Sequence, residues 1–441
     1  METIVKTEPI IEQLTHFLNG EHLILLAKQS GFLKRIPRKL DPKRFLVALF
    51  MSVLQGTTAF ASLAMNVTQL QGIRISKQAI SKRMNDSLIS FLECVLAYAL
   101  KEKLQASKPL RLQQLPFTRI LFQDSTNIPL PSKLSANFPG SKNWTKKDFS
   151  TVKIQAVYDM LQEQFVWFYF SPFTVNDQYI ATTILDFVRR GDLIVRDLGY
   201  FVLNALTKLH QRGAYFITRF RYGIVLLDPA TGERINLLNL LKRSHQCDCK
   251  VLLGSTENLK VRLVAVPVAS EVAAERRRRL KTNRDRRLNP SKDHLALMGW
   301  DIFLVNVDAD LLPPDEVVAL YGLRWRIETI FKAWKSHFHK VKFPTQISAR
   351  QVRVSLYALC IFVTIFHIVI VAPLTGVTDP QQRANRPLSL LRLSQYFKEL
   401  FMAAVFFVFR PIKLFDHLRY YGAYDLRHDR LNYCQKRLVL S

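Results

Sequence analysis

One run of the chain, Leu356–Leu374, contains no Lys, Arg, Asp or Glu and constrains the fold more than any other segment. Its length is close to the roughly 20 residues that a helix needs to cross a bilayer. A fully buried helix at the centre of a layered α/β domain is equally apolar on all sides. The buried helix is favoured over the membrane helix, because His367 lies inside the run, Pro373 lies near its end and no comparable second span accompanies it. We therefore expect a layered α/β protein.

The chain is strongly basic, since its 441 residues include 63 Lys and Arg against 35 Asp and Glu, a net charge of +28. This excess is larger than solubility requires and indicates a polyanionic partner, whether DNA, RNA or an anionic membrane surface. The five cysteines are an odd and scattered set, which argues against a disulfide framework and for a reducing compartment. The N-terminus lacks the layout of a signal peptide. We expect a cytoplasmic protein.

Residues 1–115 are expected to form a helical region, because apolar residues recur at helical spacing in Phe45–Leu54 and Leu88–Leu100. Within this region, Leu63–Met84 has the pattern of a helix-turn-helix, with a break at Gly72 and a second helix that follows Ser76. The basic and polar side chains of that second helix suit DNA contact. An ordinary solvated helix face is the alternative.

From Arg119 onward the pattern changes to short β-rich runs, followed by alternating helix and strand. Such an order predicts a mixed α/β sheet whose first strands are neighbours. The expected strands are Ile120–Phe122, Lys153–Met160, Phe165–Phe170, Leu193–Arg196 and Ala214–Phe220, and the expected helices are Asp177–Arg190 and Phe201–Arg212.

Residues 221–297 interrupt this alternation with further β-type runs and the basic stretch EVAAERRRRLKTNRDRRLNPSK, and they are interpreted as an insertion. A strand over Asp301–Val307 then leads through two prolines into a long helix, expected over Asp315–His337. The predicted division is a helical N-terminal region 1–115, an α/β domain in two parts, 116–220 and 298–375, a β-rich basic insertion 221–297, and a helical C-terminal region 376–441 suited to dimerisation.

Two of the predicted strands are each followed by an aspartate. Asp124 comes shortly after the first strand, and Asp197 comes directly after Leu193–Arg196. Catalytic groups collect at the carboxyl edge of α/β sheets, so both side chains are candidates for chemistry. A turn or cap residue is the alternative for each aspartate taken alone.

The predicted long helix carries four polar residues, Tyr321, Arg324, Glu328 and Lys335, on one face. At about 100° per residue, these positions fall within roughly 60° of one another. A tyrosine hydroxyl, two cations and a carboxylate are an unusual set for a core. Solvated surface decoration is the alternative, but the two aspartates at strand ends make that alternative weaker.

Asp124, Asp197 and Glu328, if brought together, would need protons or metal ions to offset their like charges. Hard oxygen ligands of this kind suit Mg²⁺ or Mn²⁺. Two such ions about 3.5–4 Å apart would activate a water or a 3′-hydroxyl and stabilise the leaving oxygen in phosphodiester displacement. The sequence therefore predicts hydrolysis and transfer at phosphorus, with these three residues as catalytic metal ligands.

The spacing of the helix residues in YGLRWRIETIFKAWK resembles the YREK signature of the insertion-sequence-4 family of DDE transposases. Asp124 in FQDST is similar to the family's first aspartate motif, and Asp197 in RDLGY is similar to its second. The insertion also resembles the family's β-rich insertion domain. The resemblance implies an RNase H-like catalytic domain and metal-dependent cut-and-paste transposition, by hydrolysis at transposon ends and strand transfer into target DNA.

The same resemblance assigns roles to individual residues. It implies that Tyr321, Arg324 and Lys335 hold DNA phosphates beside the cleavage site while Glu328 ligates metal. Trp300, just before the strand that leads to the long helix, resembles a family tryptophan that stacks on a flipped base, and a core tryptophan is the alternative.

Arg219 in YFITRF resembles a phosphate-contacting arginine of the family. The basic run Arg276–Arg287 is expected to contact the DNA backbone without reading sequence, and a solvated charge run is the alternative.

The expected partners are transposon-end and target DNA, bound by a homodimer, in a bacterial-type cytoplasm in association with the nucleoid. Neither a membrane nor ATP is expected as a partner. ATP is not expected because no Gly-x4-Gly-Lys-Ser/Thr motif occurs. Two alternatives keep the same scaffold: a catalytically retired DNA-binding protein, and a nuclease without strand transfer.

Overall fold

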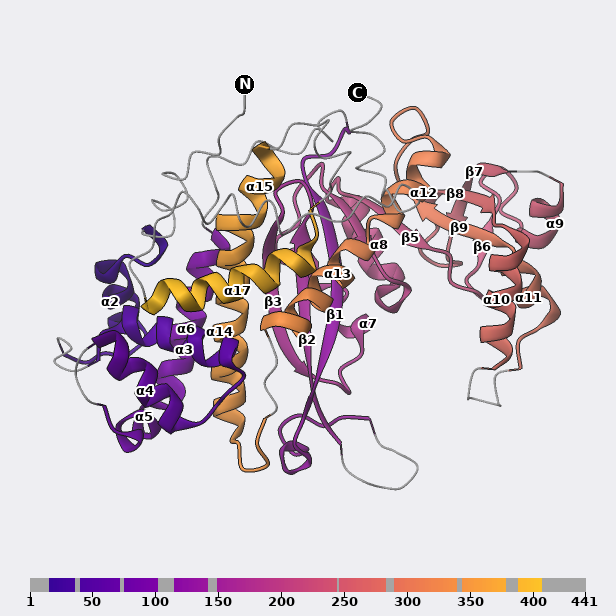
Figure 1. Ribbon diagram of the computed structural model, residues 1–441. Coiled ribbons are helices and arrows are strands. Elements are labelled where there is room, and N and C mark those ends of the chain that lie inside the picture. Colours follow the sequence, from indigo (N-terminus) through magenta and orange to yellow (C-terminus); the bar gives the residue numbers. More distant parts are fainter. Residues whose placement is uncertain are drawn as a thin grey trace. The chain divides into compact units, whose positions relative to one another are not determined.

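The computed structural model describes residues 16–35, 40–71, 75–101, 115–141, 149–243, 246–282, 289–338, 343–377 and 388–406 (Figure 1). The chain forms two compact units. The first unit consists of Met1–Leu112, Asp124–Val175 and Trp325–Ser441, and the second of Gln113–Gln123 and Asn176–Arg324. Strand β1, Ile120–Leu130, begins in the second unit and ends in the first.

The first unit opens with helices whose ends are set by local capping. The carboxylate of Asp41 accepts hydrogen bonds from the backbone N–H groups of Lys43 and Arg44 at 3.3 and 3.4 Å, and so caps the N-terminus of α3. The same helix ends at Gly56, whose φ of 72° is left-handed, as is common for glycine after a helix. The helices are α2 Gly20–Gln29, α3 Pro42–Gln55, α4 Phe60–Gln71, α5 Lys77–Arg83 and α6 Asp86–Lys101.

Helices α4 and α5 occupy the two positions of the predicted helix-turn-helix. Ser76 caps α5, as expected, because its hydroxyl accepts a hydrogen bond from the N–H of Ala79 at 3.2 Å. Gly72 lies outside the described residues. The contact of α5 with DNA stays a prediction.

The apolar run Leu356–Leu374 lies in a continuous helical segment formed by α14, Ala349–Phe366, a π-helical turn, His367–Val371, and α15, Ala372–Val377. Residues Ala349–Leu374 are long and apolar enough to cross a membrane by length and composition, yet 89% of the apolar window is buried inside the protein. Helices α3 and α6 lie beside α14 in Figure 1 and contact it. The buried core helix favoured by the sequence is confirmed.

The strands of the first unit form a hairpin. Strands β2, Ser150–Asp159, and β3, Gln164–Pro172, are antiparallel, with register Val152↔Pro172 through Asp159↔Gln164 and an irregularity at Val157 and Tyr158. The strand order in this unit is β3-β2-β1. The expected strands at these positions are confirmed, and β1 extends further along the chain than expected.

In the second unit the strand order is β1-β4-β5-β9-β8-β7-β6, with the first residues of β1 included. Strands β1, β4 and β5 are parallel neighbours, while β5, β9, β8, β7 and β6 pair antiparallel. The strands of the predicted insertion therefore extend the same sheet through β9, and the mixed α/β class is confirmed. The strands are β4 Leu193–Arg196, β5 Tyr215–Arg219, β6 Leu226–Leu227, β7 Cys247–Leu253, β8 Leu259–Pro267 and β9 Trp300–Val305.

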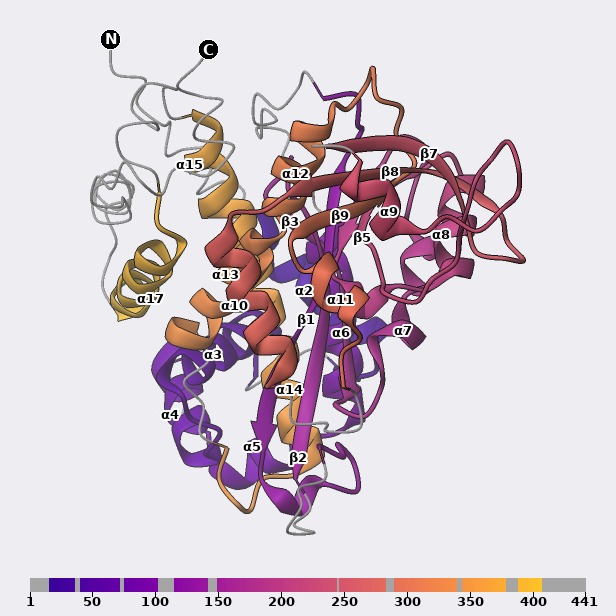
Figure 2. The same cartoon turned by 90° about the vertical axis from the view of Figure 1, so that its right-hand side faces the viewer.

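Helices of the second unit pack on this sheet around an apolar cluster that includes Ile194, Phe216, Leu263 and Leu304. In Figure 2, α10 and α11 lie below β7, β8 and β9. The five-part division predicted from the sequence stays a prediction. The helices are α7 Asp177–Ile180, α8 Leu203–Gln211, α9 Leu237–Lys242, α10 Ser270–Lys281, α11 Lys292–Leu297 and α12 Pro314–Gly322, with 3-10 turns at Thr183–Asp186 and Leu198–Tyr200.

Two expected helices were wrong in extent. The helix expected over Asp177–Arg190 is only a short α-helix and a 3-10 turn, because the backbone hydrogen bonds there close over three residues. The helix expected over Asp315–His337 is interrupted after Gly322, a residue of low helix propensity. The N–H of Arg324 bonds the carbonyl of Tyr321 at 3.1 Å in the turn between the two pieces.

The second piece of that helix belongs to the first unit. It comprises α13, Trp325–Ala333, followed by a π-helical turn, Trp334–Phe338. The four residues expected on one regular helix face therefore lie in α12, the turn, α13 and the π-helical turn. The geometry of a single straight helix does not apply to them.

We predict that His367 makes the first unit sensitive to mild acid. Burial, and secondarily the nearby Arg326, lowers the pKa of His367 to about 3 from the usual 6.5. Below pH 6.5 the imidazole of His367 binds a proton in the unfolded chain but not in the folded chain. The free energy of unfolding should therefore fall by about 1.4 kcal/mol for each unit by which the pH is lowered. Urea unfolding between pH 6.5 and 5, where carboxylates titrate little, would measure this slope. His367→Gln should flatten it, and an unchanged slope would assign the sensitivity to another group.

Candidate functional site

The parallel pairing of β1 with β4 is locked at both ends in the second unit. At the start, the guanidinium of Arg119 donates to both carboxylate oxygens of the fully buried Asp192, from Nε at 3.0 Å and from Nη2 at 2.5 Å. At the end, Nη1 of Arg196 donates to Oε1 of Gln123 at 3.2 Å. The register closes at Gln123↔Arg196. A one-residue slip would break both side-chain bonds, so this register is strongly specified.

Asp124 and Asp197 are the residues that immediately follow this last paired position. Both side chains are half-buried. Asp197 has extended backbone angles, φ −69° and ψ 161°, and its carbonyl accepts from the N–H of Tyr200 at 3.0 Å, which starts a 3-10 turn. Asp197 directly follows β4, as expected, whereas the strand end expected before Asp124 was wrong, because β1 continues to Leu130 and Asp124 lies inside it.

Tyr321 is the centre of a charged cluster in the second unit. Its side chain is buried in α12, and the guanidinium carbons of Arg219 and Arg324 lie 5.5 and 5.9 Å from its ring centroid. Burial raises the pKa of Tyr321, the two arginines lower it and Asp197 raises it, with a net rise. The hydroxyl therefore stays protonated at neutral pH. The structure brings together these four of the residues singled out by sequence.

A carboxylate that the sequence analysis overlooked holds Arg219 in place. Oδ1 of Asp301 accepts from Nη2 of Arg219 at 2.8 Å and from Nη2 of Arg276 at 2.9 Å. Nε of Arg219 is buried and has no hydrogen-bond partner within the described part of the chain. Two cations share one anion, so the cluster keeps a net positive charge.

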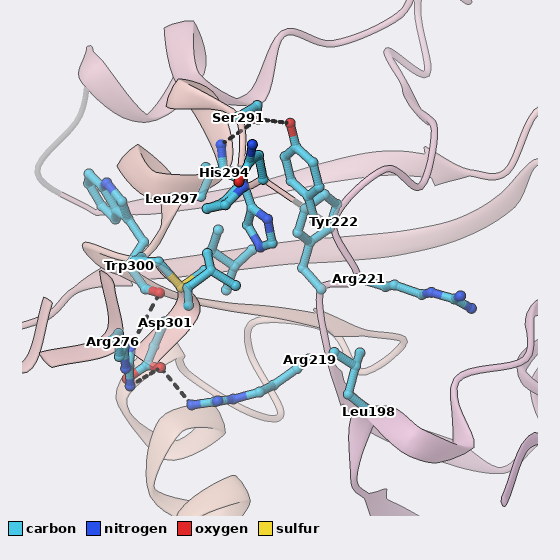
Figure 3. Close-up of a pocket in the computed structure, with 16 residues that line it drawn as sticks. Leu198, Arg219, Arg221, Tyr222, Arg276, Ser291, His294, Leu297, Trp300 and Asp301 are labelled. Atoms are coloured by element: carbon cyan, nitrogen blue, oxygen red, sulfur yellow. Dashed lines mark hydrogen bonds and ion pairs between the residues drawn. The ribbon is translucent and has the colours of Figure 1, made fainter. Parts of the chain in front are cut away.

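A cavity of about 630 Å³ adjoins this cluster in the second unit (Figure 3). The ring of Tyr222 stacks on His294, with centroids 4.1 Å apart and planes 4° apart, and its hydroxyl lies 2.6 Å from Oγ of Ser291. Trp300, the first residue of β9, lies across the cavity from Tyr222 in Figure 3, with Asp301 beside it. Aromatic rings and arginines thus line one hollow. The position of Tyr222, three residues after Arg219, was a signal that the sequence analysis did not use.

The arginine run on α10 is divided between internal and exposed roles. Arg276 donates to Asp301, and Nε of Arg277 donates to the carbonyl of Leu295 at 3.0 Å, which ties α10 to α11. Arg278 and Arg279 are exposed and pair with Glu275 on the same helix. The later arginines of the run, 284, 286 and 287, lie outside the described residues. DNA contact by the run stays a prediction.

The remaining predicted residues, Glu328 and Lys335, lie in the first unit, as does Asp124. Glu328 is half-buried on α13, whereas Lys335 is exposed on the π-helical turn. Partial desolvation of its ammonium group lowers the pKa of Lys335. Within the described ranges, the structure contains no group of three or more His, Cys, Asp or Glu side chains close enough to hold a metal ion. Asp124, Asp197 and Glu328 are divided between the two units.

Comparison with known proteins identifies the class of enzyme and then the family. Residues 115–363 match the family model described as the transposase DDE domain, and this segment contains every site residue predicted from the sequence. The class is an enzyme that cleaves DNA and transfers strands. The chain belongs to the transposase DDE domain family.

Relatives at the level of whole chains agree with this assignment. The transposase for insertion sequence element IS231B of Bacillus thuringiensis subsp. berliner is 30% identical over 351 residues, which cover 74% of this chain and 72% of that protein. The transposase for insertion sequence element IS1151 of Clostridium perfringens is 24% identical over 401 residues, which cover 85% and 83%. The chain is similar to transposases of insertion sequences over most of its length.

Among solved structures, the chain is similar to a piggyBac transposase in a synaptic complex with hairpin DNA. The TM-score is 0.44 at 11% sequence identity, over 93% of this chain and 84% of that one.

We predict that Asp301 stabilises the second unit through its two arginines. Asp301→Asn removes the charge that separates two guanidinium groups, so the free energy of unfolding should fall by about 1 kcal/mol. Arg278→Gln, which breaks an exposed ion pair on α10, should leave stability unchanged. Urea unfolding of both variants measures the difference. Equal effects would mean that the Asp301 cluster is no stronger than a surface pair.

Proposed function

We propose that the chain cuts and joins DNA at the ends of an insertion sequence, with Asp124, Asp197 and Glu328 as the catalytic carboxylates. The observation that carries the proposal is the register Gln123↔Arg196, because it puts each aspartate directly after the last paired residue of two parallel neighbours. Catalytic groups collect at that edge of α/β sheets. The family match and the insertion-sequence relatives support the same reaction.

The donor set suits divalent metal. Three carboxylates offer only hard oxygen ligands, which Mg²⁺ and Mn²⁺ prefer. Two bound ions would supply Lewis-acid activation of the attacking oxygen and charge stabilisation at the leaving oxygen. Asp124, Asp197 and Glu328 would hold those ions.

The remaining signature residues hold DNA phosphates in this proposal, as the YREK pattern of the insertion-sequence-4 family implies. Arg219 and Arg324 flank the ring of Tyr321, whose protonated hydroxyl can donate one hydrogen bond. Arginine forks bind phosphate oxygens well, and the buried Nε of Arg219 is a donor in need of an acceptor. Lys335 would add a further cation from the first unit.

Trp300 and the cavity beside it are proposed to receive a DNA base. Base stacking on aromatic rings is sequence-tolerant, and the arginines nearby would hold the attached phosphate.

The reaction needs no ATP, because each step either hydrolyses one phosphodiester bond or replaces one phosphodiester bond with another. Water forms a bond to phosphorus at the transposon end while the bond to the 3′-oxygen breaks, and that oxygen takes up a proton. The freed 3′-hydroxyl then forms a bond to a second phosphorus, in the opposite strand or in target DNA, and loses its proton. The bond from that phosphorus to its own 3′-oxygen breaks, and the released 3′-oxygen takes up a proton.

The expected assembly is a homodimer that joins two transposon ends, in a bacterial cytoplasm and associated with the nucleoid. This expectation comes from the family resemblance. Synapsis of two ends requires two recognition surfaces, and two copies of one chain supply them with a single symmetry operation.

We predict that Glu328→Gln abolishes catalysis and spares DNA binding. Loss of one carboxylate oxygen charge should weaken metal binding and slow cleavage by at least about a hundredfold. The measurement is Mg²⁺-dependent cleavage and joining of a duplex that carries the terminal repeats flanking the gene. Glu316→Gln is the matched control, because Glu316 is also half-buried and lies on the preceding helix, α12.

The outcomes of this assay separate the alternatives. If Glu328→Gln cuts as well as the unmodified protein, Glu328 is not a catalytic ligand. Nicked DNA without joined product from the unmodified protein would identify a nuclease. DNA binding without any cleavage by the unmodified protein would identify a catalytically retired DNA-binding protein.

We predict that Trp300 stacks on one specific base near the transposon end. Trp300→Ala should weaken binding or slow cleavage by about five- to hundredfold, since stacking of a base on an aromatic side chain contributes about 1–3 kcal/mol. Trp300→Phe should retain most of the activity. Abasic nucleotides placed at each terminal position in turn should make Trp300→Ala equal to the unmodified protein at one position. A defect that persists at every position would assign Trp300 to the core.

A further inference from the structure

A buried glutamate in an uncommon backbone conformation lies at the turn between β2 and β3. Glu163 has a φ of 52°, in the left-handed region that non-glycine residues rarely adopt. The residue is 2% exposed, and glutamate is almost never fully buried unless it is paired. This conformation is unfavourable for a non-glycine residue and persists only where the surrounding contacts fix it. The contacts of the carboxylate are therefore the feature to explain.

The carboxylate of Glu163 is bound by two donors from different elements. The fork of Arg326, on α13, donates from Nε to Oε2 at 3.2 Å and from Nη2 to Oε1. The hydroxyl of the fully buried Tyr158, on β2, donates to Oε2 and also lies 3.2 Å from Nδ1 of His367. Burial raises the pKa of Tyr158 well above its usual value, so its hydroxyl stays a donor. Each carboxylate oxygen thus has an assigned partner.

These contacts tie α13 to the β2–β3 hairpin at one end, and aromatic packing ties it at the other. The ring of Trp334, directly after α13, lies 4.9 Å from that of Phe165 and 5.9 Å from that of Phe168, both on β3. Glu328 lies between these two attachment points. At about 100° per residue, Glu328 is about 200° around the helix from Arg326. The ion pair therefore holds one side of α13 while Glu328 projects from nearly the opposite side.

We propose that Glu163 and Arg326 are positioning residues that set the orientation of α13 and thereby of the Glu328 carboxylate. The inference rests on the proposed catalytic role of Glu328. A bidentate arginine–carboxylate pair fixes geometry as well as distance, which apolar packing does not do. Catalytic constellations lose about a hundredfold in rate when a group is displaced by about 1 Å. A small rotation of α13 would displace the carboxylate at the end of the Glu328 side chain by about that distance.

The energetics favour a positioning role over a stabilising one. A buried ion pair is weak evidence for stability, since the desolvation of both charges offsets much of their attraction. Specific orientation is what such a pair supplies in addition to packing, and Phe165, Phe168 and Trp334 already supply the packing. The left-handed conformation of Glu163 points the same way, because strained residues are retained where a particular geometry is needed.

The test compares Glu163→Gln, Arg326→Lys and the double variant with the unmodified chain. Three quantities are measured: the affinity for terminal-repeat DNA, the single-turnover cleavage rate at saturating DNA and Mg²⁺, and the affinity for Mn²⁺ without DNA by electron paramagnetic resonance. Glu93→Gln is the matched control, because its carboxylate also accepts from a tyrosine hydroxyl in the first unit, that of Tyr357 at 2.7 Å, away from α13.

We expect both single variants to cleave about ten- to hundredfold more slowly and to bind Mn²⁺ more weakly, while DNA affinity stays within about threefold. The double variant should be no slower than the slower single variant, because both changes break one interaction. Glu93→Gln should match the unmodified chain in all three measurements. If Glu163→Gln fails to fold, Arg326→Lys carries the test, since it keeps the charge and loses only the fork.

Two results would overturn the positioning role. One is a cleavage rate within twofold of the unmodified chain in both single variants. The other is a parallel loss of DNA affinity and cleavage with unchanged Mn²⁺ affinity, which is the signature of general loosening. Glu328→Gln, assayed beside them, keeps the two proposals apart. If Glu328→Gln still cleaves DNA, the proposed catalytic role of Glu328 is wrong. If Glu328→Gln is inactive while the Glu163 and Arg326 variants are fully active, only the positioning role is wrong.

Discussion

The parallel pairing of β1 and β4 is the constraint on which the site depends. Two arginines, Arg119 and Arg196, bond across this pair and hold its register at both ends. Burial lowers the pKa of Arg196 to about 10, which leaves it charged at neutral pH directly before Asp197. Because a strand alternates its side chains with a period of two, any slip would turn the following aspartate to the other face. The register of β1 and β4 therefore determines on which face of the sheet the aspartate side chains lie.

Arginine in this protein serves internal geometry as much as external charge. The net charge of +28 indicates a polyanionic partner, yet several of the arginines are committed to carboxylates and carbonyls inside a unit. The buried Arg262 is an example, since it pairs with Asp248 and donates to the carbonyls of Val307 and Leu312. A count of basic residues therefore overstates the surface available to DNA. The clusters around Asp301 and Tyr321 combine both uses, with arginines that are oriented internally and keep a net positive charge.

The apolar helix α14 and the network at its π-helical turn link the core of the first unit to α13. His367 is the first residue of the π-helical turn, is buried, and is neutral because its pKa is depressed. It contacts Tyr158, which in turn binds the glutamate that holds Arg326. A polar residue in a long uncharged run is thus explained by a specific partner. Through these contacts the buried apolar segment is connected to α13, the helix that carries Glu328.

The sequence by itself determined the mixed α/β class, the burial of the apolar helix, and the placing of Asp197 directly after a strand, because the hydrophobic period is a local property. The membership in a DDE transposase family also followed from spaced residues. Only the tertiary structure decided that the helix with Tyr321 and Glu328 breaks after Gly322 and that α13 is held by Glu163. These depend on contacts between residues far apart in sequence, such as Glu163 with Arg326, and no local pattern encodes them. Asp301 and Tyr222 could not be singled out from the sequence for the same reason, because their roles depend on side chains that only the fold brings beside them.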